Sequence, residues 1–330
     1  MASLVWLRRA KALPFSAIAV VLMTVGAGAQ SSLDDVHITP RLDPSISTSG
    51  TAHEAPIKVD ANLVLVPVTI TDEMNRVVTG LEQTNFEVLE NKQRQEIRHF
   101  SSQDEPVSIG IIFDISTSMS NKIDWAREAV KNLLDSANPQ DEFFLISFAD
   151  QPQLLVDFTR SVEQVQNQMV YLAPKGRTAL LDAVYMGVSK MREARYARRA
   201  LMIISDGGDN RSRYTEGELK SLVKEADVLI YAAGIYDRNF ASEEERRGPE
   251  LLNEIATLTG AQSFTVDNPN QLPRITKSIG IQLRYQYVLG YRPSKHPGDS
   301  TWRKIRVRLK LPKGARHLGI FAKTGYYSAR

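Results

Sequence analysis

The chain has 330 residues, of which 42% are hydrophobic and 24% charged, and it contains no cysteine. Its formal net charge of +3 belongs to the N-terminus, because the first 29 residues carry three of the 41 basic side chains and no acidic ones, which leaves 38 of each sign. The lack of cysteine excludes disulfides, thiolate nucleophiles, thiolate metal sites and a lipid-modified cysteine, and the neutral remainder has no overall attraction for nucleic acid.

The N-terminal segment has the layout of a secretory signal peptide. Three basic residues precede an apolar run over 15–25 and the small residues Ala27, Gly28 and Ala29. This run is shorter than the roughly 20 residues of a membrane span, so we favour a cleaved signal over 1–29 rather than an uncleaved anchor. We expect an exported bacterial protein, either periplasmic, cell-surface or secreted, with no membrane span after signal removal.

A polar stretch and then a β-rich unit follow the signal. Residues 30–60 are rich in Ser, Thr and Pro and show no sustained period, which is typical of a flexible linker. Residues 61–103 contain short alternating strands with no helix between them, a unit too small to close a core alone. Pro67 cannot donate a hydrogen bond to a neighbouring strand, so we predict that its strand is an edge strand.

The segment 104–283 alternates apolar strands with amphipathic helices. The strand candidates share short, continuous apolar runs and cover residues 107–113, 142–148, 153–158, 200–204, 228–233 and 262–266. The second and third are separated by only four residues, which indicates a hairpin. The pattern predicts an α/β domain with a doubly wound, mostly parallel, six-stranded sheet and one antiparallel edge strand. We interpret residues 237–249, which are mixed in charge, as a solvated loop.

The C-terminal part returns to β character. A last helix is predicted over 271–283, and residues 284–330 contain further short strands. These strands and those of 61–103 each need partners, and the termini of a compact domain usually lie close together. We therefore expect one small β-sandwich into which the α/β domain is inserted.

Three separate stretches place oxygen ligands where a predicted strand or loop meets the next element. Asp114, Ser116 and Ser118 come at every second residue after the first α/β strand. Thr178 follows a Pro/Gly loop and precedes a helical run, and Asp206 follows another apolar strand. Open α/β sheets place their sites at the carboxyl ends of strands, so these residues are candidates for a single site.

The order and spacing of these residues resemble the von Willebrand factor type A (VWA) domain, a family that includes integrin I domains. The five residues match the positions of its metal-ion-dependent adhesion site (MIDAS). The resemblance implies a Rossmann-like fold in which Ser116, Ser118 and Thr178 bind the ion through neutral hydroxyls. Asp114 and Asp206 would act through bound waters and hydrogen bonds. The arrangement of the whole chain also resembles exported acidobacterial VWA-related proteins.

Hard oxygen ligands favour Mg²⁺, with Mn²⁺ or Ca²⁺ as alternatives. By the same resemblance, an ion with few direct carboxylate ligands keeps much of its charge and accepts an Asp or Glu from another protein. The expected function is metal-dependent protein binding of the adhesion type, with an acidic protein ligand as partner and no enzymatic activity. The oligomeric state is open.

Several alternatives stay open at this point. Each Asp and Ser alone could be a helix cap or turn residue, and Asp209 and Asn210 are typical of an ordinary exposed turn. A serine hydrolase needs a base, but no histidine lies within 104–283, and the first loop has no glycine-rich nucleotide motif. Metal-assisted hydrolysis is a minor alternative. The main alternative is a structural subunit of an envelope complex without metal-dependent binding.

Overall fold

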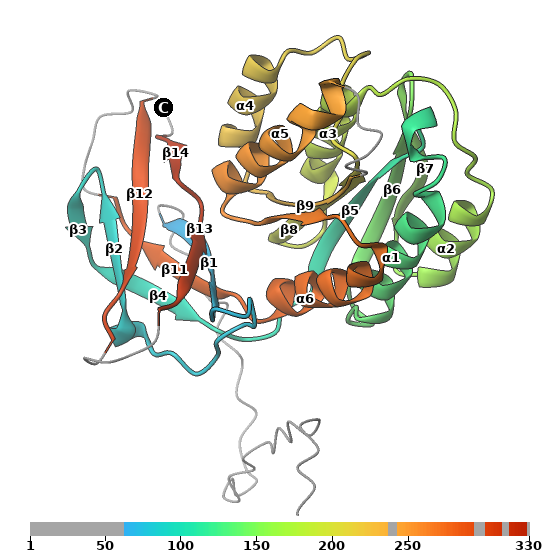
Figure 1. Ribbon diagram of the computed structural model, residues 1–330. Helices are drawn as coiled ribbons and strands as arrows, with labels where there is room; N and C mark the ends of the chain where they lie inside the picture. Colours follow the sequence, from blue (N-terminus) through green and yellow to red (C-terminus); the bar gives the residue numbers. More distant parts are fainter. Residues whose placement is uncertain (1–62, 237–242, 294–300, 312–316, 329–330) are drawn as a thin grey trace, which may run out of the picture. The chain divides into compact units, whose positions relative to one another are not determined.

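The computed structural model describes residues 63–236, 243–293, 301–311 and 317–328 (Figure 1). The predicted signal and linker lie outside these residues. No helix within the described ranges combines the length and the apolar character that a bilayer crossing requires.

A six-stranded sheet forms the centre of the α/β domain, in the order β10-β9-β8-β5-β6-β7 (Figure 1). Its strands are β5 (Val107–Asp114), β6 (Glu142–Phe148), β7 (Pro152–Thr159), β8 (Arg198–Ser205), β9 (Leu229–Ile235) and β10 (Ser263–Val266). Neighbouring strands are parallel except β6 and β7, which form an antiparallel hairpin. Every residue of β5, β6 and β9 is buried, as expected for strands covered on both faces. The predicted fold class is confirmed.

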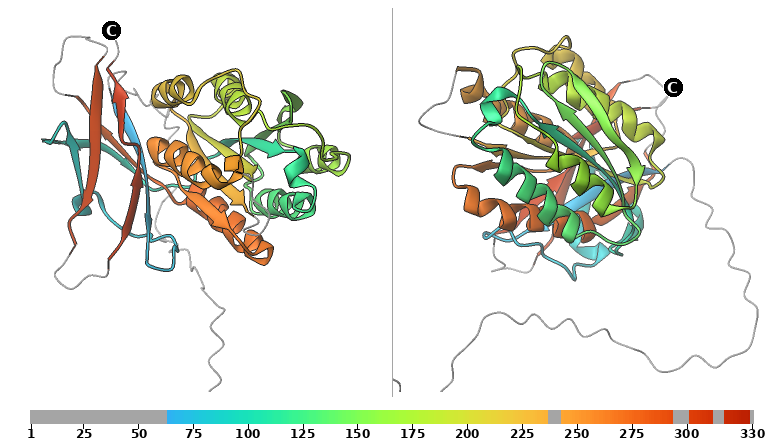
Figure 2. Two further views of the ribbon diagram at one scale, coloured as in Figure 1. Left: turned by 45° about the horizontal axis from the view of Figure 1, so that its top comes forward. Right: turned by 90° about the vertical axis from the view of Figure 1, so that its right-hand side faces the viewer.

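Helices cover both faces of this sheet (Figure 2). They are α1 (Ile123–Asp135), α2 (Val162–Val170), α3 (Leu180–Lys190), α4 (Glu216–Glu225), α5 (Glu243–Thr259) and α6 (Leu272–Arg284), with the short 3-10 helices η1 (Gln83–Asn85), η2 (Thr117–Met119), η3 (Met191–Glu193) and η4 (Pro269–Gln271). The apolar faces of α1, α2 and α6 share one core with the sheet, and those of α3, α4 and α5 share the other. Local caps set the start of α2 and α4, where Ser161 accepts from Gln164 N–H and Thr215 forms a capping box with Glu218.

One expectation within the α/β domain is wrong. We interpreted residues 237–249 as a solvated loop, but residues 243–249 belong to α5, which continues beyond Pro249, and residues 237–242 lie outside the described residues. Pro249 lies inside α5, where its missing N–H leaves the helix without one backbone hydrogen bond, and the helix nevertheless continues beyond it to Thr259. Gly248 is buried against the backbone of Gly207, so the start of α5 packs on the loop that follows Asp206.

The remaining strands form two antiparallel sheets of four strands each (Figure 1). One has the order β13-β1-β11-β4 and contains β1 (Val64–Thr71), β4 (Ile97–Ser101), β11 (Tyr287–Tyr291) and β13 (Gly319–Ala322). The other has the order β14-β12-β2-β3 and contains β2 (Phe86–Glu90), β3 (Gln93–Gln95), β12 (Trp302–Leu309) and β14 (Gly325–Tyr327). Both sheets combine strands from before and after the α/β domain, and one apolar cluster lies between them. The α/β domain is therefore inserted in a β-sandwich.

The prediction that the strand containing Pro67 is an edge strand is wrong. β1 lies between β11 and β13. The register explains how the proline is tolerated: β11 pairs with residues 64–68, whereas β13 pairs only with residues 68–71. Pro67 therefore has a neighbouring strand on one side only, and its lack of an N–H leaves no carbonyl of β13 unpaired.

Gly110 provides a test of the packing around β5, the strand that leads to Asp114. A Cβ at this position would overlap the side chains of Phe144 and Leu201 from the two neighbouring strands. We expect Gly110→Ala to lower the free energy of unfolding by about 1–3 kcal/mol in urea titrations, because a full core must shift to admit the methyl group. Gly217→Ala on α4, where only Thr215 Oγ1 lies within 4.0 Å, should be neutral or slightly stabilising. Equal effects of the two variants would contradict this account of the core.

Candidate functional site

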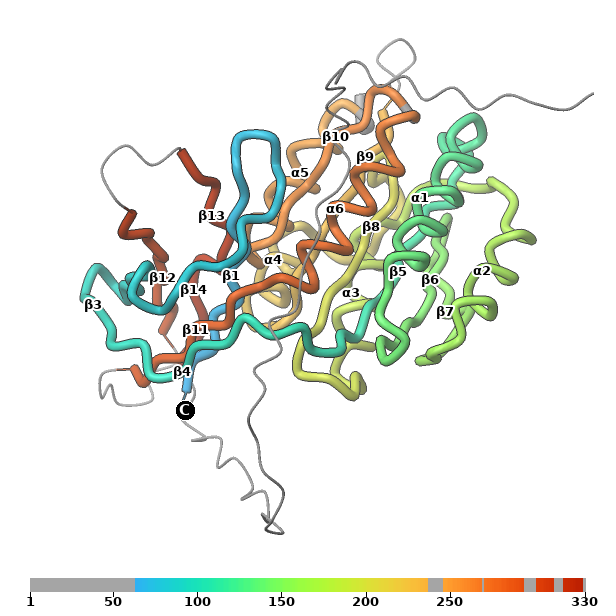
Figure 3. The backbone as a smooth tube through the Cα atoms, turned by 90° about the horizontal axis from the view of Figure 1, so that it is seen from below, coloured from blue at the N-terminus to red at the C-terminus, as the bar shows by residue number. Residues whose placement is uncertain are grey.

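The candidate residues lie where β5 and β8 end side by side at the carboxyl edge of the sheet. β5 and β8 are adjacent and parallel, with Phe113 opposite Ile204, so Asp114 and Asp206 follow at the same edge (Figure 3). Both aspartates are fully buried. Two carboxylates are thus held next to each other, out of contact with water.

The Asp114 carboxylate forms hydrogen bonds with the loop after β5 and with the end of β8. One of its carboxylate oxygens accepts a hydrogen bond from the Ser116 backbone N–H at 2.8 Å, and the other accepts from Ser205 Oγ at 2.5 Å. Ser205 Oγ in turn accepts from the Gly207 N–H at 2.9 Å. Both oxygens of Asp114 are therefore engaged, which suits a carboxylate that positions other groups rather than one that points into open space.

Asp206 forms an ion pair with Lys122, a residue that the motif did not predict as part of the site. Lys122 Nζ lies 3.1 Å from Asp206 Oδ2, and the two side chains are only 4% and 1% exposed. The other carboxylate oxygen, Oδ1, is buried and has no hydrogen-bond partner among the described residues. A buried oxygen without a donor is costly, so this atom is a position where a cation or a water would be stabilised.

The two serines of the first loop are in contact with each other. Ser116 Oγ and Ser118 Oγ lie 3.0 Å apart, with Ser116 buried and Ser118 half-buried. They sit just before and within η2, the 3-10 turn that leads into α1. Spacing of two residues therefore places both hydroxyls on one side of the loop.

Hydrogen bonds join the loop that contains Thr178 to the loop after β5 and to the loop after β8. The Thr178 N–H donates to Asn210 Oδ1 at 3.1 Å, and the Thr178 carbonyl accepts from the N–H groups of Asn210 and Arg211. On the other side, the Gly176 carbonyl accepts from the N–H and the Oγ1 of Thr117. All three predicted stretches are thus brought together, and Asn210 has a structural role that an ordinary exposed turn would not have.

The electrostatics of the site are dominated by the two carboxylates. Burial, followed by repulsion from Asp206, raises the pKa of Asp114 to about 7, against the lowering effect of the hydrogen bonds from Ser116 and Ser205. Burial and the charge of Asp206 also raise the pKa of Tyr236, whose hydroxyl is buried without a hydrogen-bond partner among the described residues. Positive charge next to these groups would be stabilising.

The residues present fit a hard divalent cation held largely by hydroxyl oxygens. The candidate ligands are the hydroxyls of Ser116, Ser118 and Thr178 and two carboxylates, and Asp206 Oδ1 has no hydrogen-bond partner in the described part of the chain. Within the described ranges no group of three or more His, Cys, Asp or Glu residues could hold a metal, so a metal here needs the hydroxyls as ligands. The chemistry of the donor set is compatible with Mg²⁺, Mn²⁺ or Ca²⁺.

Three residues that build this site were not predicted from the sequence: Lys122, Ser205 and Gly248. Ser205 directly precedes Asp206, and Lys122 lies eight residues after Asp114, so both were close to the motif. Their roles depend on which side chains meet in space, which spacing alone did not indicate. Gly248 is more than 40 residues away and had no local signal.

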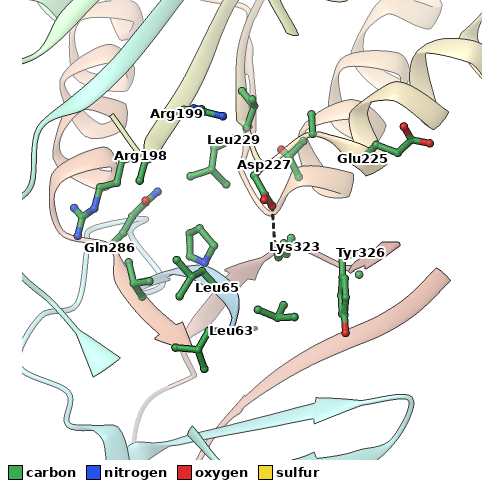
Figure 4. A pocket seen from close by; sticks show the side chains of 18 of the residues that line it. Leu63, Leu65, Arg198, Arg199, Glu225, Asp227, Leu229, Gln286, Lys323 and Tyr326 are labelled. Carbon is green, nitrogen blue, oxygen red and sulfur yellow. Dashed lines mark hydrogen bonds and ion pairs between the residues drawn. The ribbon is translucent and has the colours of Figure 1, made fainter. Parts of the chain in front are cut away.

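A larger cavity lies away from these loops and contains none of the five candidate residues. It has a volume of about 1030 Å³, and its lining includes Leu65, Arg198, Gln286, Lys323 and Tyr326 (Figure 4). Two ion pairs lie in its lining, Lys323 with Asp227 at 2.9 Å and Arg198 with Glu105 at 3.2 Å. The candidate site was therefore chosen by the convergence of the three loops and not by the volume of a cavity.

Comparison with known proteins identifies the domain that carries the site. The family described as von Willebrand factor type A domain matches residues 109–208, so the chain contains a VWA domain. The chain is 22% identical over 184 residues to an uncharacterised protein of Borreliella burgdorferi, covering 48% of this chain and 54% of that protein. It is 32% identical over 95 residues to bovine inter-alpha-trypsin inhibitor heavy chain H4, covering 27% of this chain and 10% of that protein. The match thus spans only about half of the Borreliella protein.

Solved structures similar to this chain include a protein from Catenulispora acidiphila and one from the mussel byssus. A von Willebrand factor type A protein from Catenulispora acidiphila has a TM-score of 0.49 at 13% identity, covering 81% of this chain and 75% of that chain. Proximal thread matrix protein 1 from the mussel byssus, in a form described as having a zinc-occupied MIDAS motif, has a TM-score of 0.46 at 18% identity, covering 60% of this chain and 50% of that chain.

The raised pKa of Asp114 generates a test in the metal-free protein. An unfolded Asp ionises near 3.8, whereas the buried Asp114 holds its proton to about 7. Its contribution to stability is therefore complete below pH 3.8 and is lost as the pH rises through 7. In EDTA, Asp114→Asn should be more stable than the wild type at pH 8 by about 1 kcal/mol or more and should differ little at pH 4, as measured by urea unfolding. A difference of the same size at both pH values would contradict the assignment.

Proposed function

We propose that this protein is an exported, cation-dependent protein-binding module. The observation that supports the proposal is the convergence of the three loops that carry the candidate residues, where Asp114 and Asp206 are buried and Asp206 Oδ1 has no partner among the described residues. Mg²⁺ is the proposed ion, with Mn²⁺ and Ca²⁺ as alternatives. Export to the bacterial envelope or beyond rests on the signal-like segment over 1–29.

The protein's own residues would hold the ion and leave it able to bind an anion. Ser116, Ser118 and Thr178 would provide neutral hydroxyl oxygens, so they would not cancel the charge of the ion. Asp114 would orient the loops through its bonds to Ser116 and Ser205, as it does in the structure. When bound, the ion supplies a Lewis-acidic position for a partner's Asp or Glu carboxylate. We propose no catalysis, because no histidine in the α/β domain is available as a base.

The charges around the site support an acidic partner. Four exposed basic residues lie on the two loops that are clamped together: Lys175, Arg177, Arg211 and Arg213. None of them forms an ion pair with another described residue. The nearby carboxylates of Asp150 and Asp182 already accept backbone N–H groups. Complementary charge of this kind speeds encounter with an acidic partner and aids selection.

The alternative is a structural subunit of an envelope complex whose VWA domain provides only an assembly surface. One observation favours it: Lys122 already neutralises Asp206, so the site can be stable without a metal. Cation binding separates the two functions.

We expect Mg²⁺ or Mn²⁺ to raise the thermal midpoint of the metal-free protein and to bind in calorimetry. Ser118→Ala removes one half-buried hydroxyl and should weaken this binding by about tenfold or more, while the unfolding free energy changes by less than about 0.5 kcal/mol. Ser221→Ala, on the exposed side of α4, is the matched control and should bind like the wild type. If none of Mg²⁺, Mn²⁺ and Ca²⁺ binds to the wild type, the assembly-subunit function is favoured instead.

We further expect capture of a specific protein from envelope extract in Mg²⁺ that is lost in chelator and in Ser118→Ala. Reversing two charges of the basic loops, in Arg177→Glu combined with Arg211→Glu, should slow association with the captured protein and reduce its dependence on salt. Lys131→Glu on α1, an exposed lysine in a different part of the domain, serves as the charge control. Association that is unaffected by the double reversal would contradict an acidic partner.

A further inference from the structure

Lys122 is an unusual residue for its position and carries an inference beyond the candidate ligands. Its side chain is 4% exposed, and Asp206 Oδ2, one of its partners, lies 3.1 Å from its ammonium. Lysine is rarely buried unless it is paired, because removing an ammonium from water is costly. The energy that keeps Lys122 inside therefore comes in part from a carboxylate of the candidate site.

The stability of α1, the helix that begins after Lys122, does not account for a lysine at this position. Lys122 is the N-cap residue of α1, and its side chain makes no capping hydrogen bond. Ser, Thr, Asp and Asn are favoured at this position because their side chains accept the free N–H groups, and the positive end of the helix dipole disfavours a cation there. A residue selected for the stability of α1 alone would not be lysine.

The charge of Lys122 would also affect a cation bound at the site. Asp114 and Asp206 are two buried acids whose repulsion Lys122 partly offsets. A divalent cation added to two carboxylates would give a neutral site, whereas the same cation added in the presence of Lys122 gives a site with one net positive charge. The lysine therefore opposes the cation, and it leaves the loaded site more attractive to an anion.

We propose that Lys122 is a built-in counter-ion that competes with the divalent cation for Asp206. In the cation-free protein it stabilises the buried carboxylates, and in the loaded protein it weakens cation affinity and strengthens the preference for a carboxylate ligand. This inference rests on the proposed cation-binding function and specifies how that site is tuned. A purely structural lysine would instead stabilise the free and the loaded protein equally.

The test compares two neutral variants in the full chain at pH 8. Lys122→Met removes the charge and all donors, whereas Lys122→Gln removes the charge but keeps an N–H donor for Asp206, so that at least one variant is expected to fold. Mg²⁺ and Mn²⁺ affinities are measured by calorimetry, and thermal midpoints are measured in EDTA and in saturating cation. Lys131→Met, on the exposed face of α1, is the matched control.

We expect both variants to have lower thermal midpoints than the wild type in EDTA and midpoints near that of the wild type in saturating cation. Their cation affinity should be tighter by about tenfold or more, because a unit charge a few ångströms away in a protein interior is worth at least that factor. Binding of free acetate or glutamate to the loaded protein should be weaker than in the wild type.

The possible failures are distinct. If the variants lose the same stability in EDTA and in saturating cation and their affinities are unchanged or weaker, the lysine is structural and the inference is wrong, although the cation site stands. If neither the wild type nor the variants bind any of the cations, the proposed function itself fails, and the inference fails with it. Wild-type affinity and stability in both variants would likewise overturn the inference.

Discussion

The structure of the site depends on the burial of two like-charged carboxylates next to each other. Asp114 and Asp206 are both inaccessible to solvent, and each would be strongly disfavoured without compensation. The compensation is local: Ser116 and Ser205 donate to Asp114, and Lys122 pairs with Asp206. These groups come from two segments of the chain, residues 114–122 and 205–206, so these two segments must lie together for the charges to be tolerated. The two carboxylates can therefore stay buried only while the loops hold Ser116, Ser205 and Lys122 beside them.

The sheet provides the framework on which the loops converge. β5 and β8 are parallel neighbours, so the residues that follow each of them lie at the same edge without any long loop. Backbone hydrogen bonds then join the loops, with the carbonyls of Gly176 and Thr178 accepting from residues of the first and third loops. The start of α5 adds a further contact, because Gly248 lies against Gly207 with no space for a side chain. In the β-sandwich, strands that precede the α/β domain in the sequence pair with strands that follow it.

Where the sequence-based predictions were wrong, local signals conflicted with tertiary packing. Pro67 indicated an edge strand, but β1 lies inside its sheet, because β13 begins to pair only after the proline. The mixed charge of residues 237–249 indicated a solvated loop, but residues 243–249 lie in α5, which continues through Pro249, and Gly248 permits close contact with Gly207. Pro67 does lack the N–H on which its prediction rested. The register of β13 accommodates this loss, and that register depends on how the neighbouring strands pair.

The sequence alone determined the class of fold and the residue types of the candidate site. Continuous apolar runs specify strands buried on both faces, and amphipathic periods specify the helices that cover them, so the six-stranded sheet could be predicted and is confirmed. The five candidate residues Asp114, Ser116, Ser118, Thr178 and Asp206 could be chosen because they follow strands or precede a helix, and their binding of a cation stays a prediction. Only the tertiary structure decided that Lys122 lies beside Asp206, because contacts between side chains distant in sequence depend on the packing of the whole domain. For the same reason the structure, and not the spacing, shows that Asp206 Oδ1 is a buried oxygen without a described partner.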